Sequence, residues 1–129
     1  MTKPQSKTQK KIDNNIRIAL TAVCEHALKG VHGFLWLTHE ANYTNFPASL
    51  FVTCVFDTEE NLQKAMDEGK TPLLRKHIQA SLLKVGVKFK SVNQQVCFDS
   101  EEACMQMHEG DWKARFASKS GRAVPRNRP

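Results

Sequence analysis

The chain has 129 residues and a mass of 14.6 kDa, with 40% hydrophobic and 25% charged residues. This size predicts a single globular domain with one hydrophobic core. No apolar run approaches the roughly 18 residues of a membrane span, and no apolar stretch follows the first lysines as it would in a signal peptide. We therefore expect a cytoplasmic protein without a membrane partner, and we exclude secreted disulfide scaffolds and large cofactor enzymes.

The formal net charge of +6 is unevenly distributed along the chain. Residues 1–11 carry four lysines and residues 112–129 carry six basic side chains, and neither segment contains an acid. The other nine basic residues share the middle of the chain with all 13 acidic residues. The last twelve residues have too little apolar surface to offset the entropy cost of ordering them. We predict a disordered basic arm at 1–11, one domain at 12–117 and a disordered basic tail at 118–129.

Apolar residues at helical spacing predict a first helix over 12–29, which Gly30 would end. Runs rich in aromatic and β-branched residues predict strands at 34–39 and 49–56, and their closeness suggests an antiparallel pair. Since apolar side chains fall on both faces of the second strand, we expect it to be the central one.

Two helices are expected next, separated by a glycine. The first would be capped by Asp57 or Thr58 and run through residue 68, and the second would begin with Thr71 as N-cap and Pro72 in the first turn. Gly86 would end the second helix.

The remaining elements are a strand region and a last helix. Residues 87–92 and 95–98 could form a hairpin or one bent strand, and Ser100 would cap the last helix. The order αββααβ(β)α predicts an α+β fold, a small two-layer sandwich with helices packed on a mainly antiparallel sheet. Six residues of the second strand and of the helix after Gly69 should be buried in the core: Val52, Cys54, Phe56, Leu74, Ile78 and Leu82.

The cysteines indicate neither a disulfide scaffold nor a metal site. Cys24, Cys54, Cys97 and Cys104 lie in apolar segments, which is typical of reduced core residues. Cys104 and His108 share a helical face and could offer two zinc ligands, but no second closely spaced pair completes a site. We expect no metal and no cofactor.

No motif assigns a catalytic activity. Gly69, Lys70 and Thr71 match the end of a phosphate-binding loop, but Lys64 occupies the position where that motif needs a glycine. His39 and Glu40 are adjacent and therefore point in different directions along a strand. We expect a non-enzymatic protein.

Two glycine motifs raise nucleic-acid hypotheses. Residues 30–33 (GVHG) match the letters of the loop with which KH domains clamp a nucleic-acid backbone, although that loop joins two helices and this one joins helix to strand. The helix, Gly69 turn and helix suggest a helix-turn-helix with Ala65 at its small position. In that motif the residue at position 75 should be buried and apolar, and here it is Arg75.

Clustered basic residues are the strongest indication of function, because lysine and arginine release counterions from a nucleic-acid backbone. Trp112 and Phe116 could either stack on bases or dock the last helical turn onto the core. We predict nucleic-acid contacts, to DNA or RNA, at a basic face over 70–90 and in the C-terminal segment: Lys70, Arg75, Lys76, Lys84, Lys88, Lys90, Lys113, Arg115, Lys119, Arg122, Arg126 and Arg128. The alternative is a protein-interaction module, with a protein partner or a second copy, whose basic tails only confer solubility.

The chain also resembles two known families. Residues 34–39 (FLWLTH), 46–47 (FP), 55–58 (VFDT), 98–104 (FDSEEAC) and 110–112 (GDW) are similar to short bacterial proteins labelled as Fis-type transcriptional regulators, a label that implies DNA binding. The element order is similar to that of ribosome-binding factor A. That resemblance implies a KH-like fold and binding to ribosomal RNA.

Overall fold

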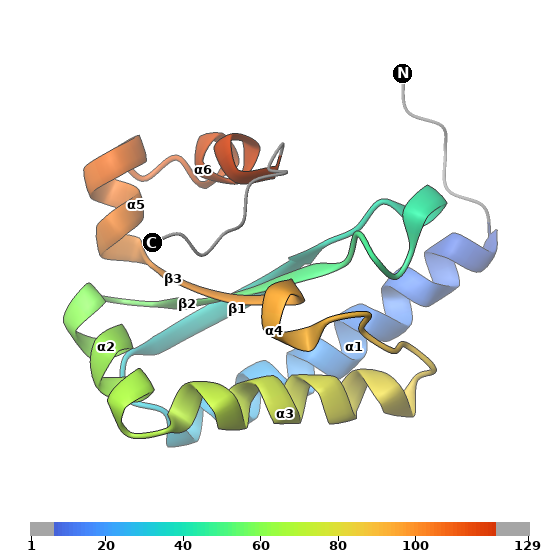
Figure 1. Ribbon diagram of the computed structural model, residues 1–129, viewed down its shortest axis with the longest axis horizontal. Coiled ribbons are helices and arrows are strands. Elements are labelled where there is room, and N and C mark those ends of the chain that lie inside the picture. The colour runs from blue at the N-terminus through green and yellow to red at the C-terminus, as the bar shows by residue number, and fades with distance from the viewer. Residues whose placement is uncertain (1–6, 121–129) are drawn as a thin grey trace.

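The computed structural model describes residues 7–120 and has an α+β fold, as predicted (Figure 1). None of the described helices is long and apolar enough to cross a membrane. The elements are α1 (Lys7–Gly30), β1 (Phe34–Glu40), the short 3-10 helix η1 (Tyr43–Asn45), β2 (Phe51–Phe56), α2 (Glu59–Asp67), α3 (Lys70–Lys84), α4 (Val92–Gln95), β3 (Val96–Ser100), α5 (Glu101–His108) and α6 (Trp112–Ser120).

The three strands form one sheet in the order β1-β2-β3, with β2 in the centre as predicted. β1 pairs antiparallel with β2, but β3 pairs parallel with β2, so the expected mainly antiparallel sheet is found only in the first pair. The cause is the connection: α2 and α3 carry the chain from the end of β2 back to the level of its start, so β3 runs in the same direction as β2. Residues 87–91 form no strand, and 92–95 form the short helix α4.

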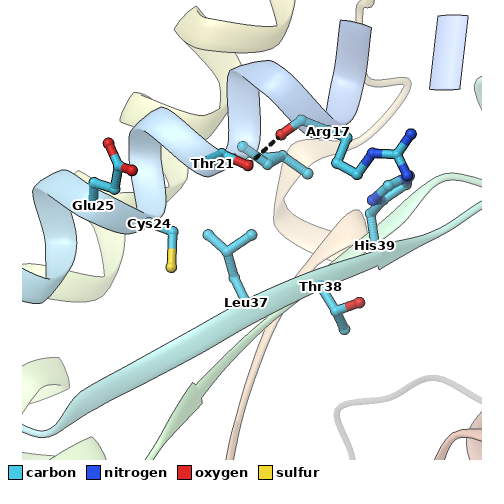
Figure 2. Close-up of a pocket in the computed structure, with 8 residues that line it drawn as sticks. Arg17, Thr21, Cys24, Glu25, Leu37, Thr38 and His39 are labelled. Carbon is cyan, nitrogen blue, oxygen red and sulfur yellow. Dashed lines mark hydrogen bonds between the residues drawn. The ribbon is translucent and has the colours of Figure 1, made fainter. Parts of the chain in front are cut away.

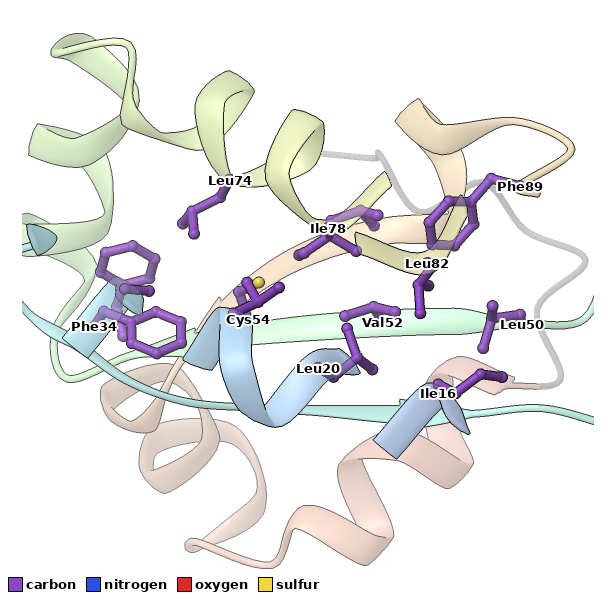
Figure 3. Close-up of a cluster of buried hydrophobic side chains, with 14 of the residues drawn as sticks. Ile16, Leu20, Phe34, Leu50, Val52, Cys54, Leu74, Ile78, Leu82 and Phe89 are labelled. Carbon is purple, nitrogen blue, oxygen red and sulfur yellow. The ribbon is translucent and has the colours of Figure 1, made fainter. Parts of the chain in front are cut away.

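The helices lie on both sides of the sheet. α1 and α3 run side by side and cover one face, while α5 and α6 cover part of the other, adding a partial third layer to the expected sandwich (Figure 1). The main core lies between the α1–α3 layer and the sheet (Figure 3). All six residues predicted for this core are buried, each with at most 4% of its surface exposed.

The boundaries of the first helix differ from the prediction. α1 begins at Lys7, so residues 7–11 are helical and do not belong to a disordered arm. Lysine and glutamine favour helix, and no breaker separates them from the apolar stripe that starts at Ile12. Gly30 is the last helical residue, and the left-handed turn before β1 is made by Gly33, with φ 85°.

The boundaries of the later helices also differ. α3 begins at Lys70 after Gly69, whose φ is 75°, and Thr71 is a buried residue of its first turn, not its N-cap. The last helix is two helices, because Glu109 and Gly110 both adopt positive φ and break the chain between α5 and α6. α6 includes residues 118–120, which were expected in the disordered tail, and residues 121–129 lie outside the described part.

The predicted caps of α2 and α5 are confirmed. The side chain of Thr58 accepts a hydrogen bond from the backbone of Asn61, and that of Ser100 accepts one from Ala103. Both helices start directly after parallel strands, so their N-termini lie side by side at one end of the sheet (Figure 1). The backbone N–H of Glu59 donates to the carboxylate of Glu102 at 2.7 Å, which links the two helix starts.

Candidate nucleic-acid interface

Acidic and basic residues gather at opposite ends of the parallel strands β2 and β3. Ten of the protein's 13 acidic residues lie at or beyond the carboxyl ends of β2 and β3: Asp99 lies within β3, one residue before its end, and the other nine are in the helices and turns that follow these strands. This acidic end consists of Asp57, Glu59, Glu60, Asp67, Glu68, Asp99, Glu101, Glu102, Glu109 and Asp111.

The opposite end of the molecule is predominantly basic, and Asp13 of α1 and Glu40 at the end of β1 also lie toward it. The start of α1, the end of α3 and the loop after α3 all lie toward this end, because α1 and α3 run antiparallel (Figure 1). In the core, Ile16, Leu82 and Phe89 lie near this end, and Phe34 and Leu74 lie near the other (Figure 3). Six exposed lysines form what we call the lysine end: Lys7, Lys10, Lys11, Lys84, Lys88 and Lys90.

The lysines at the start of α1 are unfavourable for the helix itself. The first turn of α1 contains no acid, so the positive end of the helix dipole and three lysine charges lie together. The same arrangement strengthens the attraction for a phosphate group, since the positive end of the helix dipole and the lysine charges act on it together. Lys84 differs, because a cation in the last turn of α3 also stabilises that helix.

The predicted face over 70–90 is divided between two environments. Lys84, Lys88 and Lys90 belong to the lysine end, whereas Lys70 lies at the opposite end of α3, where its ammonium group is 3.4 Å from the carbonyl oxygen of Gly30. Lys76 is exposed in the middle of α3, on its outward side.

Arg75 packs against the edge of the sheet. Its guanidinium carbon lies 4.9 Å from the centre of the Phe98 ring, and its Nε donates to the carbonyl oxygen of Val96 at 3.4 Å. Arg75 therefore covers the outer edge of β3. This packing also explains how α3 tolerates an arginine at a position that a helix-turn-helix would fill with an apolar core residue.

Arg115 is buried and does not belong to a basic surface, contrary to the prediction. Its Nε and Nη2 donate to the two carboxylate oxygens of Asp99 at 2.6 and 2.8 Å, and only 7% of the residue is exposed. The hydrogen bonds to Asp99 raise the pKa of the guanidinium, against the opposing effect of burial. This ion pair docks α6 onto β3.

The other predicted cations of the C-terminal segment are not brought together by the described structure. Lys113 is exposed in the first turn of α6, two residues after Asp111 of the acidic end. Lys119 lies in the last turn of α6 and its side chain is outside the described part, as are Arg122, Arg126 and Arg128.

The aromatic residues near the C-terminus dock α6. The ring of Trp112 contacts those of Trp36 and Phe116 at centroid distances of 5.0 and 5.4 Å. Both indole nitrogens donate to the carboxylate of Glu101, at 2.8 Å from Trp36 and 3.0 Å from Trp112. Trp112 and Phe116 could have stacked on bases or docked the last helix onto the core, and these contacts match docking.

The glycine and cysteine motifs have structural roles. Residues 30–33 connect α1 to β1, and a Cβ on Gly33 would lie only 2.7 Å from the side chain of Asn61, so this glycine allows α2 to pack closely. Cys104 is buried, and the Nδ1 of His108 lies 3.3 Å from the guanidinium of Arg115. Within residues 7–120 no group of three or more histidine, cysteine or acidic side chains could hold a metal ion.

Comparisons of the chain with models of known families, with curated proteins and with solved structures found no significant match. The resemblances to Fis-type regulators and to ribosome-binding factor A therefore remain hypotheses. The arrangement of charge is what distinguishes a candidate surface on this fold.

Proposed function

We propose that the protein is a non-enzymatic nucleic-acid-binding protein whose lysine end contacts the phosphate backbone. The observation that carries this proposal is the polarity of the fold: six exposed lysines from two acid-free segments lie at one end, and nine acids besides the buried Asp99 lie at the other. Each phosphate neutralised by a lysine releases condensed counterions, which favours binding of any polyanion. The acidic end repels the same polyanion, so the protein approaches it in one orientation.

Structured RNA is the favoured ligand over duplex DNA, as in ribosome-binding factor A. The main elements follow the order α1, β1, β2, α2, α3, β3, with the two helices broken at Gly69, which is the order expected for that KH-like family. A helix-turn-helix is disfavoured, because Arg75 packs α3 onto the edge strand β3 where that motif would need an apolar core residue. A transcriptional role of the kind implied by the Fis-type label would instead require duplex DNA to be the better ligand.

The test compares two triple variants with equal net charge. Lys7, Lys10 and Lys11 become glutamine in the first, and Lys29, Lys64 and Lys113, which lie away from the lysine end, become glutamine in the second. Fluorescence anisotropy measures binding to a structured RNA and to a DNA duplex over a range of KCl concentrations. We expect only the first variant to bind more weakly and to show a shallower logarithmic salt slope, by about 0.7 to 0.9 for each phosphate that is no longer neutralised.

Equal weakening in both variants would show that net charge alone attracts the polyanion. If the parent protein binds neither RNA nor DNA at low salt, the proposal is wrong. A deletion of residues 121–129 measures the contribution of Arg122, Arg126 and Arg128 separately. Contacts of these arginines to phosphate would carry no information on the shape or sequence of the ligand, so this deletion should lower affinity for RNA and DNA alike.

A protein-interaction module is the second candidate, and exposed leucines favour it. Leu73 and Leu83 are 61% and 49% exposed on the outward side of α3, with Lys76 and Ala80 between them. If the lysine variant binds nucleic acid like the parent, this side of α3 becomes the better candidate surface. Replacing both leucines with glutamine should then leave the stability in urea denaturation unchanged, because both side chains lie on the exposed side of α3.

A further inference from the structure

A groove separates α1 from the edge strand β1 (Figure 2). Its volume is about 320 Å³, at the lower end of the range in which proteins bind small organic molecules. It is half open to solvent along the side of the sheet that carries no further strand. A groove of this size accommodates a small molecule or a single side chain, not a folded partner.

The middle of the groove is apolar. Leu20 and Leu37 line it from the helix and from the strand, and the thiol of Cys24 points from α1 toward β1 (Figure 2). Leu37 lies between Cys24 and His39, so the cysteine and the histidine do not form a catalytic pair. This part of the groove can bury an aliphatic or aromatic group.

One end of the groove carries a cation with unused hydrogen-bond donors. The guanidinium of Arg17 is exposed, makes a single long hydrogen bond to Asn14 at 3.3 Å, and has no ion-pair partner within residues 7–120. The nearby carboxylate of Asp13 is already engaged, because it accepts hydrogen bonds from His39 at 2.9 Å and Tyr43 at 2.7 Å. Arg17 therefore keeps hydrogen-bond donors for an anion that enters the groove, although its charge also attracts the Asp13 carboxylate.

We propose that this groove binds a small organic carboxylate, with its apolar chain along Leu20, Leu37 and Cys24 and its carboxylate on Arg17. A carboxylate matches the planar fork of a guanidinium with two parallel hydrogen bonds. One permanent cation lines the groove, so a singly charged carboxylate is matched better than a doubly charged phosphate monoester. Glu25, at the other end of the groove, repels the carboxylate and fixes the direction of the ligand.

Cys24 provides a direct reporter of occupancy, and Cys97 provides its internal control. Both thiols are partly exposed, but Cys97 lies on β3, and its side chain points to the face of the sheet opposite to the groove. The experiment measures the alkylation rate of each cysteine by iodoacetamide, followed by mass spectrometry, in the presence of octanoate. By mass action, octanoate at about ten times its Kd should slow alkylation of Cys24 about ten-fold and leave the rate at Cys97 unchanged.

Three controls test the chemistry. Octan-1-ol has the same chain without the charge and should not protect Cys24 at the same concentration. Arg17→Gln should abolish protection by octanoate, while Lys29→Gln, which removes a charge elsewhere on α1, should preserve it. Circular dichroism checks that both variants are folded.

Four outcomes would overturn the proposal: equal slowing at both cysteines, no slowing at Cys24, protection that survives Arg17→Gln, or stronger protection by octyl phosphate than by octanoate. The measurement contains no nucleic acid. Its failure would therefore leave the function proposed for the lysine end intact.

Discussion

Replacing Arg115 with alanine should destabilise the protein by about 3 to 5 kcal/mol, the usual effect of removing one partner of a buried ion pair. The side chains of Arg115 and Asp99 are only 8% and 5% exposed, and two hydrogen bonds of 2.6 and 2.8 Å join them. Removal of the guanidinium leaves the Asp99 carboxylate buried without its counter-charge. The same change also removes the main polar anchor between α6 and β3.

Urea denaturation followed by tryptophan fluorescence measures this loss directly. Trp36 and Trp112 are the protein's two tryptophans, and they contact each other where α6 meets the sheet, so their emission reports both global unfolding and undocking of α6. Lys113→Ala, at an exposed position two residues away, is the matched control and should change stability by no more than about 0.5 kcal/mol.

A double variant isolates the energy of the pair. Arg115→Ala combined with Asp99→Ala should cost less than the sum of the two single changes, because the charge left behind by each is then absent. If Arg115→Ala costs less than about 1 kcal/mol and weakens RNA binding as much as loss of a lysine does, Arg115 is a surface cation and the assignment of the ion pair is wrong.

Three further predictions concern the core, the glycines and pH. Phe56→Ala should cost about 3 to 5 kcal/mol in urea denaturation, because the ring is 0% exposed on the central strand, and a near-neutral result would contradict the packing. Gly33→Ala should destabilise the protein, since φ is 85° and the new Cβ would lie 2.7 Å from Asn61, whereas Gly30→Ala, at the last residue of α1 with nothing within 4 Å of the new Cβ, should be neutral or stabilising by up to about 1 kcal/mol. Burial raises the pKa of Asp13, but two hydrogen bonds outweigh it and hold the pKa below 3.8, so its stabilising effect is complete above about pH 4 and is lost as the pH falls through the lowered pKa. Asp13→Asn should therefore flatten the stability profile below about pH 4, and an unchanged profile would refute the hydrogen bonds.

The parts of the fold that were predictable are those with a clear local period. Alternation along residues 49–56 predicted the central strand, and the stripe through Leu74, Ile78 and Leu82 predicted the buried side of α3. Parallel pairing of β2 and β3 was not predictable in this way, because it depends on the path of about forty intervening residues and not on local side-chain alternation. Residues 87–91 have strand-like alternation, yet they serve as a loop that buries Val87 and Phe89.

The candidate site was only partly predictable. A run of basic residues indicates affinity for polyanions but does not show which charges are free. Arg115 looked like a surface cation because Asp99, its partner, is 16 residues away and meets it only after α6 folds back on β3. Residues 7–11 contain no apolar side chain, so they were assigned to a disordered arm, although the high helix propensity of their lysines was a usable signal for an extension of the helix.

The parallel pair also determines the order in which the chain can complete its sheet during synthesis. α1, β1 and β2 are all made by residue 56, and an antiparallel pair with a short connection can form at once. The second edge of β2 then has no partner until β3 emerges some forty residues later. During that interval the apolar segment 51–56 presents open backbone hydrogen-bonding groups to other nascent chains. Truncated forms that end before residue 96 should therefore aggregate more readily than the full chain. Repulsion between the lysines at the start of α1, which are already made at that stage, opposes this aggregation.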